Sequence, residues 1–95
     1  MYYIYILANN TGTTIYTGVT NNLIRRVYEH KTDADPKSFT AKYQVHKLVY
    51  YEVAESIIVA IEREKQIKGW NRKHKNKLVC TMNPKWEDLY DSILP

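Results

Sequence analysis

Three short stretches of the chain are rich in β-branched and aromatic residues, which favour strands over helices. They span residues 2–8, 14–20 and 47–53. Residues 9–13 form a turn-prone run that contains Gly12, so the first two stretches should pair as a hairpin. We therefore expect a small antiparallel sheet of three strands.

Apolar residues at helical spacing, together with cap and break residues, predict the rest of the chain. Asn21 or Asn22 can cap the first helix, Gly69 can end the second, and Pro84 interrupts the third. The predicted helices cover residues 23–31, 55–68, 71–80 and, as a short terminal helix, 86–93. The order β-β-α-β-α-α, with the terminal helix added, indicates an α+β fold in which helices flank the sheet.

Two polar residues fall on the inward stripe of the first predicted helix. A helical wheel places Arg26 and His30 on the same side as the apolar residues of that helix, whereas Glu29 should face water. A buried arginine is unfavourable unless it is paired, although its side chain can also extend outward from the edge of the stripe. A buried histidine can be an ordinary hydrogen-bonded core residue.

The second predicted helix has the same irregularity with the opposite charge. Its inward face is defined by four apolar residues, Ile57, Ala60, Ile61 and Ile67. Glu64 shares that face, and an inward carboxylate needs a cation nearby. That cation could be Arg26, in a buried ion pair, or a metal ion.

The predicted hairpin brings two phenols to one side of the sheet. Because side chains alternate along a strand, Tyr5 and Tyr16 should stand on the same face, either as core aromatics or as chemical groups. Gly18 shares that face, and a glycine within a strand often marks close approach by another group. Phosphodiester hydrolysis uses a carboxylate for a metal ion, an arginine for phosphate oxygens, and a phenol or imidazole for proton transfer.

The charge distribution adds a candidate surface for a polyanion. The chain has 95 residues, a net charge of +4, and seven of its fourteen basic residues between Arg63 and Lys77. Such a run can simply be a solvated helix face, or it can bind nucleic acid. The candidate contacts are Lys65, Lys68, Arg72, Lys73 and Lys75, with Tyr43, Tyr50 and Trp70 as candidate stacking residues.

The single cysteine, Cys80, permits no intramolecular disulfide and is expected to be buried. The apolar start of the chain is too short for a signal peptide or a membrane span. We therefore expect a cytoplasmic protein that does not associate with a membrane.

Two short motifs in the predicted hairpin resemble the two-part signature of the GIY-YIG nucleases, Tyr3-Ile4-Tyr5 and Tyr16-Thr17-Gly18. Tyr3 and Thr17 depart from the family's usual Gly and Ile. The resemblance covers residues 1 to about 80, and the remaining tail is similar to small stand-alone bacterial members related to the excision-repair nuclease subunit. It implies a nuclease core over residues 1–80, with residues 81–95 as an extension of the same single domain.

The resemblance also assigns roles to the inward polar residues. Arg26 lies where the family has its catalytic arginine, His30 where members carry His or Tyr, and Glu64 where they have the metal-binding glutamate. The implied protein is an endonuclease that cleaves DNA in repair or recombination with one divalent cation, Mg²⁺ or Mn²⁺, at Glu64. Tyr5 or Tyr16 would be the general base or its relay.

Two other readings of these residues stay open. One is a catalytically inactive module that binds nucleic acid through the basic segment 63–77. The other is a structural protein in which Arg26 and Glu64 form a buried ion pair. DNA is the expected substrate, with RNA as an alternative, and specificity would come from a partner protein or a homodimer.

Overall fold

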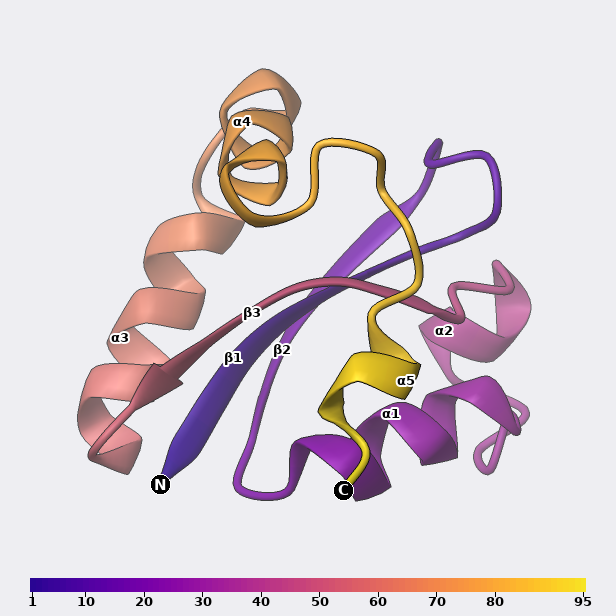
Figure 1. The fold of residues 1–95 in the computed structure, drawn as a ribbon, viewed down its shortest axis with the longest axis horizontal. Coiled ribbons are helices and arrows are strands. Elements are labelled where there is room, and N and C mark those ends of the chain that lie inside the picture. The colour runs from indigo at the N-terminus through magenta and orange to yellow at the C-terminus, as the bar shows by residue number, and fades with distance from the viewer.

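A computed structural model describes all 95 residues and contains the expected sheet. The strands are β1 (Tyr2–Ala8), β2 (Ile15–Thr20) and β3 (Lys47–Ala54). β1 lies in the centre and pairs antiparallel with both neighbours, in the order β2-β1-β3 (Figure 1). The predicted α+β fold with a three-stranded antiparallel sheet is therefore confirmed.

Five helices surround the sheet, α1 (Leu23–Lys31), α2 (Phe39–Lys42), α3 (Ile57–Lys68), α4 (Arg72–Met82) and α5 (Tyr90–Ile93). The side chains of Asn22, Ser56 and Asn71 cap α1, α3 and α4 by accepting backbone N–H groups of the first turn. Gly69 follows the last residue of α3, as expected. These caps explain why the boundaries of the three longer helices agree closely with the sequence pattern.

Two elements differ from the prediction. The one-turn helix α2 is not among the predicted helices, because at four residues it is too short to show periodicity. The terminal helix begins at Tyr90 rather than Trp86, because Trp86 has a left-handed backbone conformation with φ of 55° that a helix does not allow.

The sheet has a different buried cluster on each face. We call the face toward α3 and α4 the core face; its buried residues are Ile4, Ile6, Ala8, Val49, Tyr50, Ala54, Ala60, Ile67 and Val79. We call the face toward α1, α2 and α5 the site face; its buried apolar cluster is Tyr5, Leu7, Leu23, Val27, Val45 and Leu48. Figure 1 shows α3 and α4 to the left of the sheet and the other three helices to its right.

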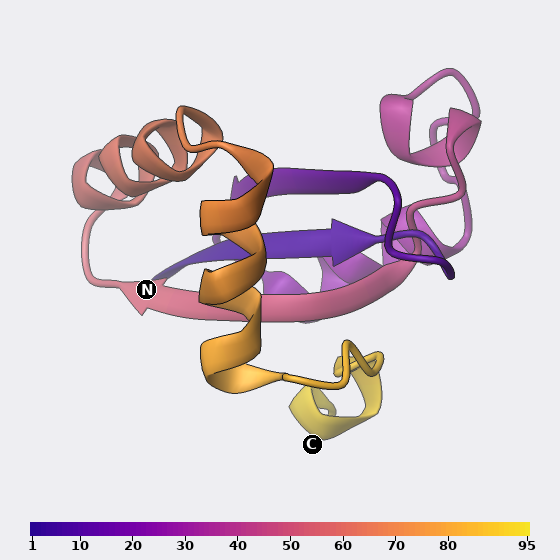
Figure 2. The same ribbon diagram turned by 90° about the horizontal axis from the view of Figure 1, so that it is seen from above.

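The inward face of α3 is rotated from the predicted one. Ile57 and Ile61 are exposed, at 41% and 37%, whereas Ala60 and Ile67 are fully buried. Helix α3 contacts all three strands and lies along the β2 side of the sheet (Figure 2). Glu64 stands between the buried Ala60 and Ile67 in the sequence of α3 and is itself partly buried. None of the five helices has the length and apolar character that a membrane-spanning helix requires.

Candidate active site

Tyr5 occupies the middle of the central strand and forms the floor of the site. Its side chain is 1% exposed, and its hydroxyl lies 3.1 Å from Nε2 of His30 on α1. Gly18 is its pairing partner on β2, and a Cβ atom there would come within 2.5 Å of the Tyr5 Cζ and hydroxyl oxygen. Gly18 therefore leaves the space that the Tyr5 ring fills, which is the close approach expected of a glycine within a strand.

Three rings from three elements meet at this floor. The ring centroids of Tyr5 and Tyr16 lie 6.3 Å apart, those of Tyr5 and His30 5.9 Å, and those of Tyr16 and His30 5.6 Å. The expectation that Tyr5 and Tyr16 share one side of the sheet is confirmed. Tyr16 is only partly buried, so the group opens toward solvent on its side.

His30 is buried and uses both ring nitrogens. Its Nδ1 lies 2.8 Å from the hydroxyl oxygen of Thr40 on α2, and its Nε2 faces Tyr5. Burial, with the nearby charge of Arg26 as a smaller cause, lowers the pKa of His30 to about 4. The imidazole is therefore neutral at pH 7, with one nitrogen donating and the other accepting.

Thr40, the second hydrogen-bond partner of His30, is not among the residues predicted from the sequence. Thr40 is 3% exposed and lies in α2, which the sequence pattern did not predict. A buried imidazole needs two hydrogen-bond partners, but nothing in the spacing of the chain indicates which hydroxyl supplies the second one.

Arg26 lies at the edge of the site rather than inside it. Its side chain is 42% exposed, and its Nη1 donates to Glu29 Oε1 at 3.1 Å. Glu29 stands three residues later on α1, within reach of the guanidinium, so it is not simply a solvent-facing residue as predicted. No ion pair joins Arg26 to Glu64, and the buried pair considered as a structural alternative is absent.

The environment of Tyr5 keeps its hydroxyl protonated. Burial is the main cause that raises the Tyr5 pKa to about 12, while the guanidinium of Arg26 opposes the shift; Tyr16 and Glu64 add smaller upward contributions. Since His30 is neutral, a consistent arrangement has Tyr5 donating to Nε2 and Nδ1–H donating to Thr40. The Tyr5–His30–Thr40 line is thus a complete hydrogen-bond chain.

Glu64 approaches the same site from α3. Its side chain is 17% exposed, and its Oε1 lies 3.6 Å from Nζ of Lys68. That ammonium in turn lies 6.0 Å from the centroid of the Tyr16 ring. The carboxylate is therefore next to the tyrosines, paired only at long range with a flexible lysine.

A divalent cation of the magnesium type suits this donor set. The protein has no group of three or more His, Cys, Asp or Glu residues that could enclose a metal ion. Mg²⁺ commonly keeps several waters and is held by only one or two carboxylates together with substrate phosphate oxygens. Glu64 is one such oxygen ligand, and an open site beside it leaves room for phosphate and water.

The predicted nucleic-acid contacts fall into two groups. Lys65, Lys68 and Lys73 are exposed, and Lys75 is partly buried. Arg72 instead donates to the backbone carbonyls of Gly12 and Thr13 and to Oδ1 of Asn76. These bonds tie α4 to the hairpin turn, so the guanidinium of Arg72 already has partners within the chain, and its contact with nucleic acid stays a prediction.

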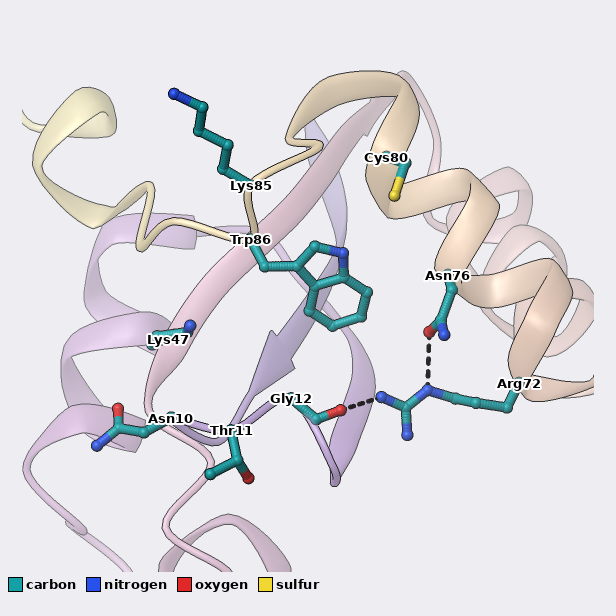
Figure 3. A pocket seen from close by; sticks show the side chains of 9 residues that line it. All are labelled: Asn10, Thr11, Gly12, Lys47, Arg72, Asn76, Cys80, Lys85 and Trp86. Carbon is teal, nitrogen blue, oxygen red and sulfur yellow. Dashed lines mark hydrogen bonds between the residues drawn. The ribbon is translucent and has the colours of Figure 1, made fainter.

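Arg72 lines a pocket of about 460 Å³ between α4, the hairpin turn and Trp86 (Figure 3). Cys80 also lines this pocket and is exposed, contrary to the prediction that it is buried. The pocket contains none of the predicted catalytic residues. The candidate active site is therefore the open group around Tyr5 rather than this cavity.

Of the predicted stacking residues, only Tyr43 is exposed, at 44%. Tyr50 is 7% exposed and belongs to the core face. Trp70 is already stacked on His74, with ring centroids 3.7 Å apart and an interplanar angle of 10°, and Arg63 lies 5.2 Å from its ring centroid. The prediction is therefore wrong for Tyr50, and the Trp70 ring already has two partners.

Comparison with known proteins agrees with this geometry. A sequence model described as the GIY-YIG catalytic domain matches residues 1–78. A UPF0213 protein of Clostridium perfringens is 36% identical over 93 residues, which cover 98% of this chain and 98% of that protein. A UPF0213 protein of Natronomonas pharaonis is 37% identical over 79 residues, covering 83% of this chain and 91% of that protein.

A solved structure is similar over the full length. The solution NMR structure of a UPF0213 protein from Bacillus halodurans superposes with a TM-score of 0.58 at 26% sequence identity, and the match covers 100% of both chains. The resemblance that the sequence motifs indicated is thereby confirmed, and the fold is that of this group of small proteins.

Proposed function

This chain belongs to the GIY-YIG family of catalytic domains, and from that premise we propose that it is a metal-dependent endonuclease that hydrolyses DNA phosphodiester bonds. The observation that carries the proposal is the convergence of Tyr5, Tyr16 and His30 on the site face, with Arg26 and Glu64 at its edge. A small core does not need two phenols and an imidazole in one place, whereas phosphodiester hydrolysis uses each of these groups.

Arg26 is placed to bind the scissile phosphate. Its side chain is half-exposed and close enough to Tyr5 to affect the pKa of the phenol. A guanidinium can donate two parallel hydrogen bonds to non-bridging phosphate oxygens while remaining charged. Glu29 would keep its hydrogen bond from Arg26 while the guanidinium also contacts the substrate, and would hold the guanidinium at the edge of the site.

Glu64 is the proposed ligand of one divalent cation, Mg²⁺ or Mn²⁺. When bound, such an ion would stabilise the charge that develops on the phosphate and on the leaving oxygen. Lys68 pairs with Glu64 only at 3.6 Å and is exposed, so it can move aside or contact the substrate backbone.

Tyr5 and His30 are the proposed proton path. As a water attacks phosphorus, its proton would pass to the Tyr5 oxygen while the Tyr5 proton passes to Nε2 of His30. Thr40 would hold the Nδ1 proton of the imidazole in place. The bond from phosphorus to the 3′ oxygen breaks, which leaves a 5′-phosphate and, after protonation from solvent, a 3′-hydroxyl.

We further propose that four lysines, Lys65, Lys68, Lys73 and Lys75, contact the DNA backbone around the site. We also propose that the protein acts in DNA repair or recombination.

We regard residues 1–80 as the nuclease core and residues 81–95 as part of the same domain. The backbone N–H of Leu89 donates to Leu48 O at 2.7 Å, and the buried side chain of Asn83 donates to Val49 O at 3.2 Å. Specificity would come from a partner protein or a second copy of the chain.

A cleavage assay tests the proposed function. Purified protein is incubated with branched, duplex and single-stranded DNA in Mg²⁺, Mn²⁺ or EDTA, beside the variants Arg26→Ala and Glu64→Gln. Two matched controls change a neighbouring residue of the same type on the same helix, Arg25→Ala on α1 and Glu62→Gln on α3; both neighbours are exposed.

We expect metal-dependent cleavage that the site variants lose and the control variants keep. Salt-sensitive binding without cleavage in any metal would refute the endonuclease and leave the inactive nucleic-acid-binding module. The exposed lysines of the basic segment favour that module as the second candidate.

A further inference from the structure

The one-turn helix α2 and the residue that follows it expose two large aromatic side chains beside the candidate active site. Phe39 is 46% exposed and Tyr43 is 44% exposed. Figure 1 shows α2 next to α1 on the site face of the sheet. Neither ring belongs to one of the two buried clusters, so packing of the core does not explain why large aromatic residues stand at these positions.

The exposed rings continue the aromatic group of the site. The Phe39 centroid lies 6.1 Å from that of Tyr16 and 4.8 Å from that of Tyr43. We call Tyr16, Phe39 and Tyr43 the aromatic row. One end of the row is in ring contact with His30, and the other end lies at the surface.

Hydrogen bonds fix the row relative to His30. Thr40 lies between the two exposed aromatics in the sequence, and its hydroxyl bonds His30 Nδ1 at 2.8 Å. The same hydroxyl lies 3.1 Å from Ser38 Oγ, which caps α2 by accepting the N–H of Ala41. The segment that carries Phe39 and Tyr43 is therefore held by a buried side chain and a cap, while Tyr16 is held by strand β2.

A lysine stands at each end of the row. Nζ of Lys42 lies 5.3 Å from the Tyr43 ring centroid, and Nζ of Lys68 lies 6.0 Å from that of Tyr16. Rings flanked by ammonium groups match a nucleic-acid strand, in which planar bases alternate with phosphates. An aromatic side chain can stack only on a base whose face is free, which excludes bases inside an intact duplex.

We propose that the aromatic row stacks unpaired bases next to the scissile phosphate, so that the preferred substrate is single-stranded DNA or a branched DNA with unpaired nucleotides. That the bound DNA is also a substrate rests on the proposed function, but the stacking itself does not require cleavage. Lys42 and Lys68 would contact the phosphates that connect the stacked bases.

A binding experiment tests the row without any chemistry. Single-stranded and duplex oligonucleotides that contain 2-aminopurine are titrated with protein in EDTA, for wild type, Phe39→Leu and Tyr43→Leu. Leucine keeps an apolar side chain but removes the ring face, and circular dichroism checks the fold. Tyr28→Leu is the matched control, because Tyr28 is a 57% exposed aromatic on α1 outside the row.

We expect each row variant to weaken single-strand binding about 5- to 150-fold, the range for one lost base stack, and to change duplex binding little. The 2-aminopurine quenching of the wild type should disappear in the row variants and persist in Tyr28→Leu. Equal weakening of single strand and duplex, or no weakening in a folded variant, would overturn the proposal.

Cleavage kinetics separate this inference from the proposed function. In an active protein, Tyr43→Leu should raise KM for single-stranded or branched DNA and leave kcat nearly unchanged, because the ring does not touch the reacting atoms. If the wild type cleaves nothing, the proposed function fails, while the binding titration still decides whether the row stacks bases.

Discussion

The two faces of the sheet use the same strand for different purposes. β1 sends Ile4, Ile6 and Ala8 to the core face and Tyr5 and Leu7 to the site face. The core face buries hydrophobic residues under α3 and α4, while the site face also buries an imidazole and a hydroxyl that hydrogen-bond each other. Because strand side chains alternate, a substitution on one face can change stability without touching the chemistry of the other.

The largest expected effect on stability belongs to the core face. Ile6 is fully buried at the centre of the sheet, and Ile6→Ala should lower the free energy of unfolding by about 2–5 kcal/mol. A domain of this size has little stability to spare. Urea denaturation followed by circular dichroism measures the loss. A loss under about 1 kcal/mol would mean that the core face is not the main source of stability.

Acid should weaken the site face through His30. The unfolded chain protonates this histidine below about pH 6.5, the folded chain only below about pH 4. Between these values the unfolded state binds more protons, so stability falls as pH falls from about 6.5 to 4, by at most about 3 kcal/mol. Denaturation at several pH values should show this loss in wild type and in His46→Gln. Its persistence in His30→Gln would assign it to another group.

Gly18→Ala tests whether the space above Gly18 is needed for the rings of Tyr5 and Tyr16. The added Cβ would lie 2.5 Å from Tyr5 and 3.0 Å from Tyr16 Cε2, so the rings must shift. We expect a loss of about 1–3 kcal/mol in the free energy of unfolding, together with lost cleavage. Gly69→Ala is the matched control, since its Cβ would meet only ordinary contacts at 3.5 and 3.6 Å. Equal effects of the two variants would contradict this account of Gly18.

Arg72 and Lys65 should separate structural from binding charges. Arg72→Gln removes hydrogen bonds to the hairpin turn, so it should cost about 1–2 kcal/mol of stability and leave the salt dependence of DNA binding nearly unchanged. Lys65→Gln should keep stability and reduce the slope of log affinity against log salt by about 0.7–0.9. Chemical denaturation and binding at several salt concentrations measure both, and a reversed pattern would identify Arg72 rather than Lys65 as the DNA contact.

The sequence predicts the sheet and the meeting of Tyr5 with Tyr16 because period-two alternation and a turn are strong local signals. It also identifies His30 as inward, since that residue follows the apolar spacing of α1. It does not reveal the ion pairs, because a helical wheel gives direction but not reach. Arg26 pairs with Glu29 and Glu64 pairs with Lys68, each on its own helix. The helical wheels had suggested that Arg26 and Glu64 could pair with each other.

The remaining differences have a tertiary origin. Helix α2 is too short to show helical periodicity, so the sequence could not predict that Phe39 and Tyr43 lie side by side next to the site. Cys80 lies next to buried Val79 but is exposed in the pocket beside α4, and Tyr50 is covered by elements far from it in the chain. Packing between elements decides these exposures, and composition alone does not.

If the site face carries the chemistry, cleavage should depend on the hydroxyl of Tyr5, the buried group at the floor of the site. Tyr5→Phe removes one oxygen and keeps the ring that fills the space over Gly18. We measure its single-turnover DNA cleavage in Mn²⁺ beside wild type, with thermal unfolding as the fold check. We expect a folded protein whose cleavage rate falls about 100-fold or more. A folded variant that cleaves at the wild-type rate would contradict the claim.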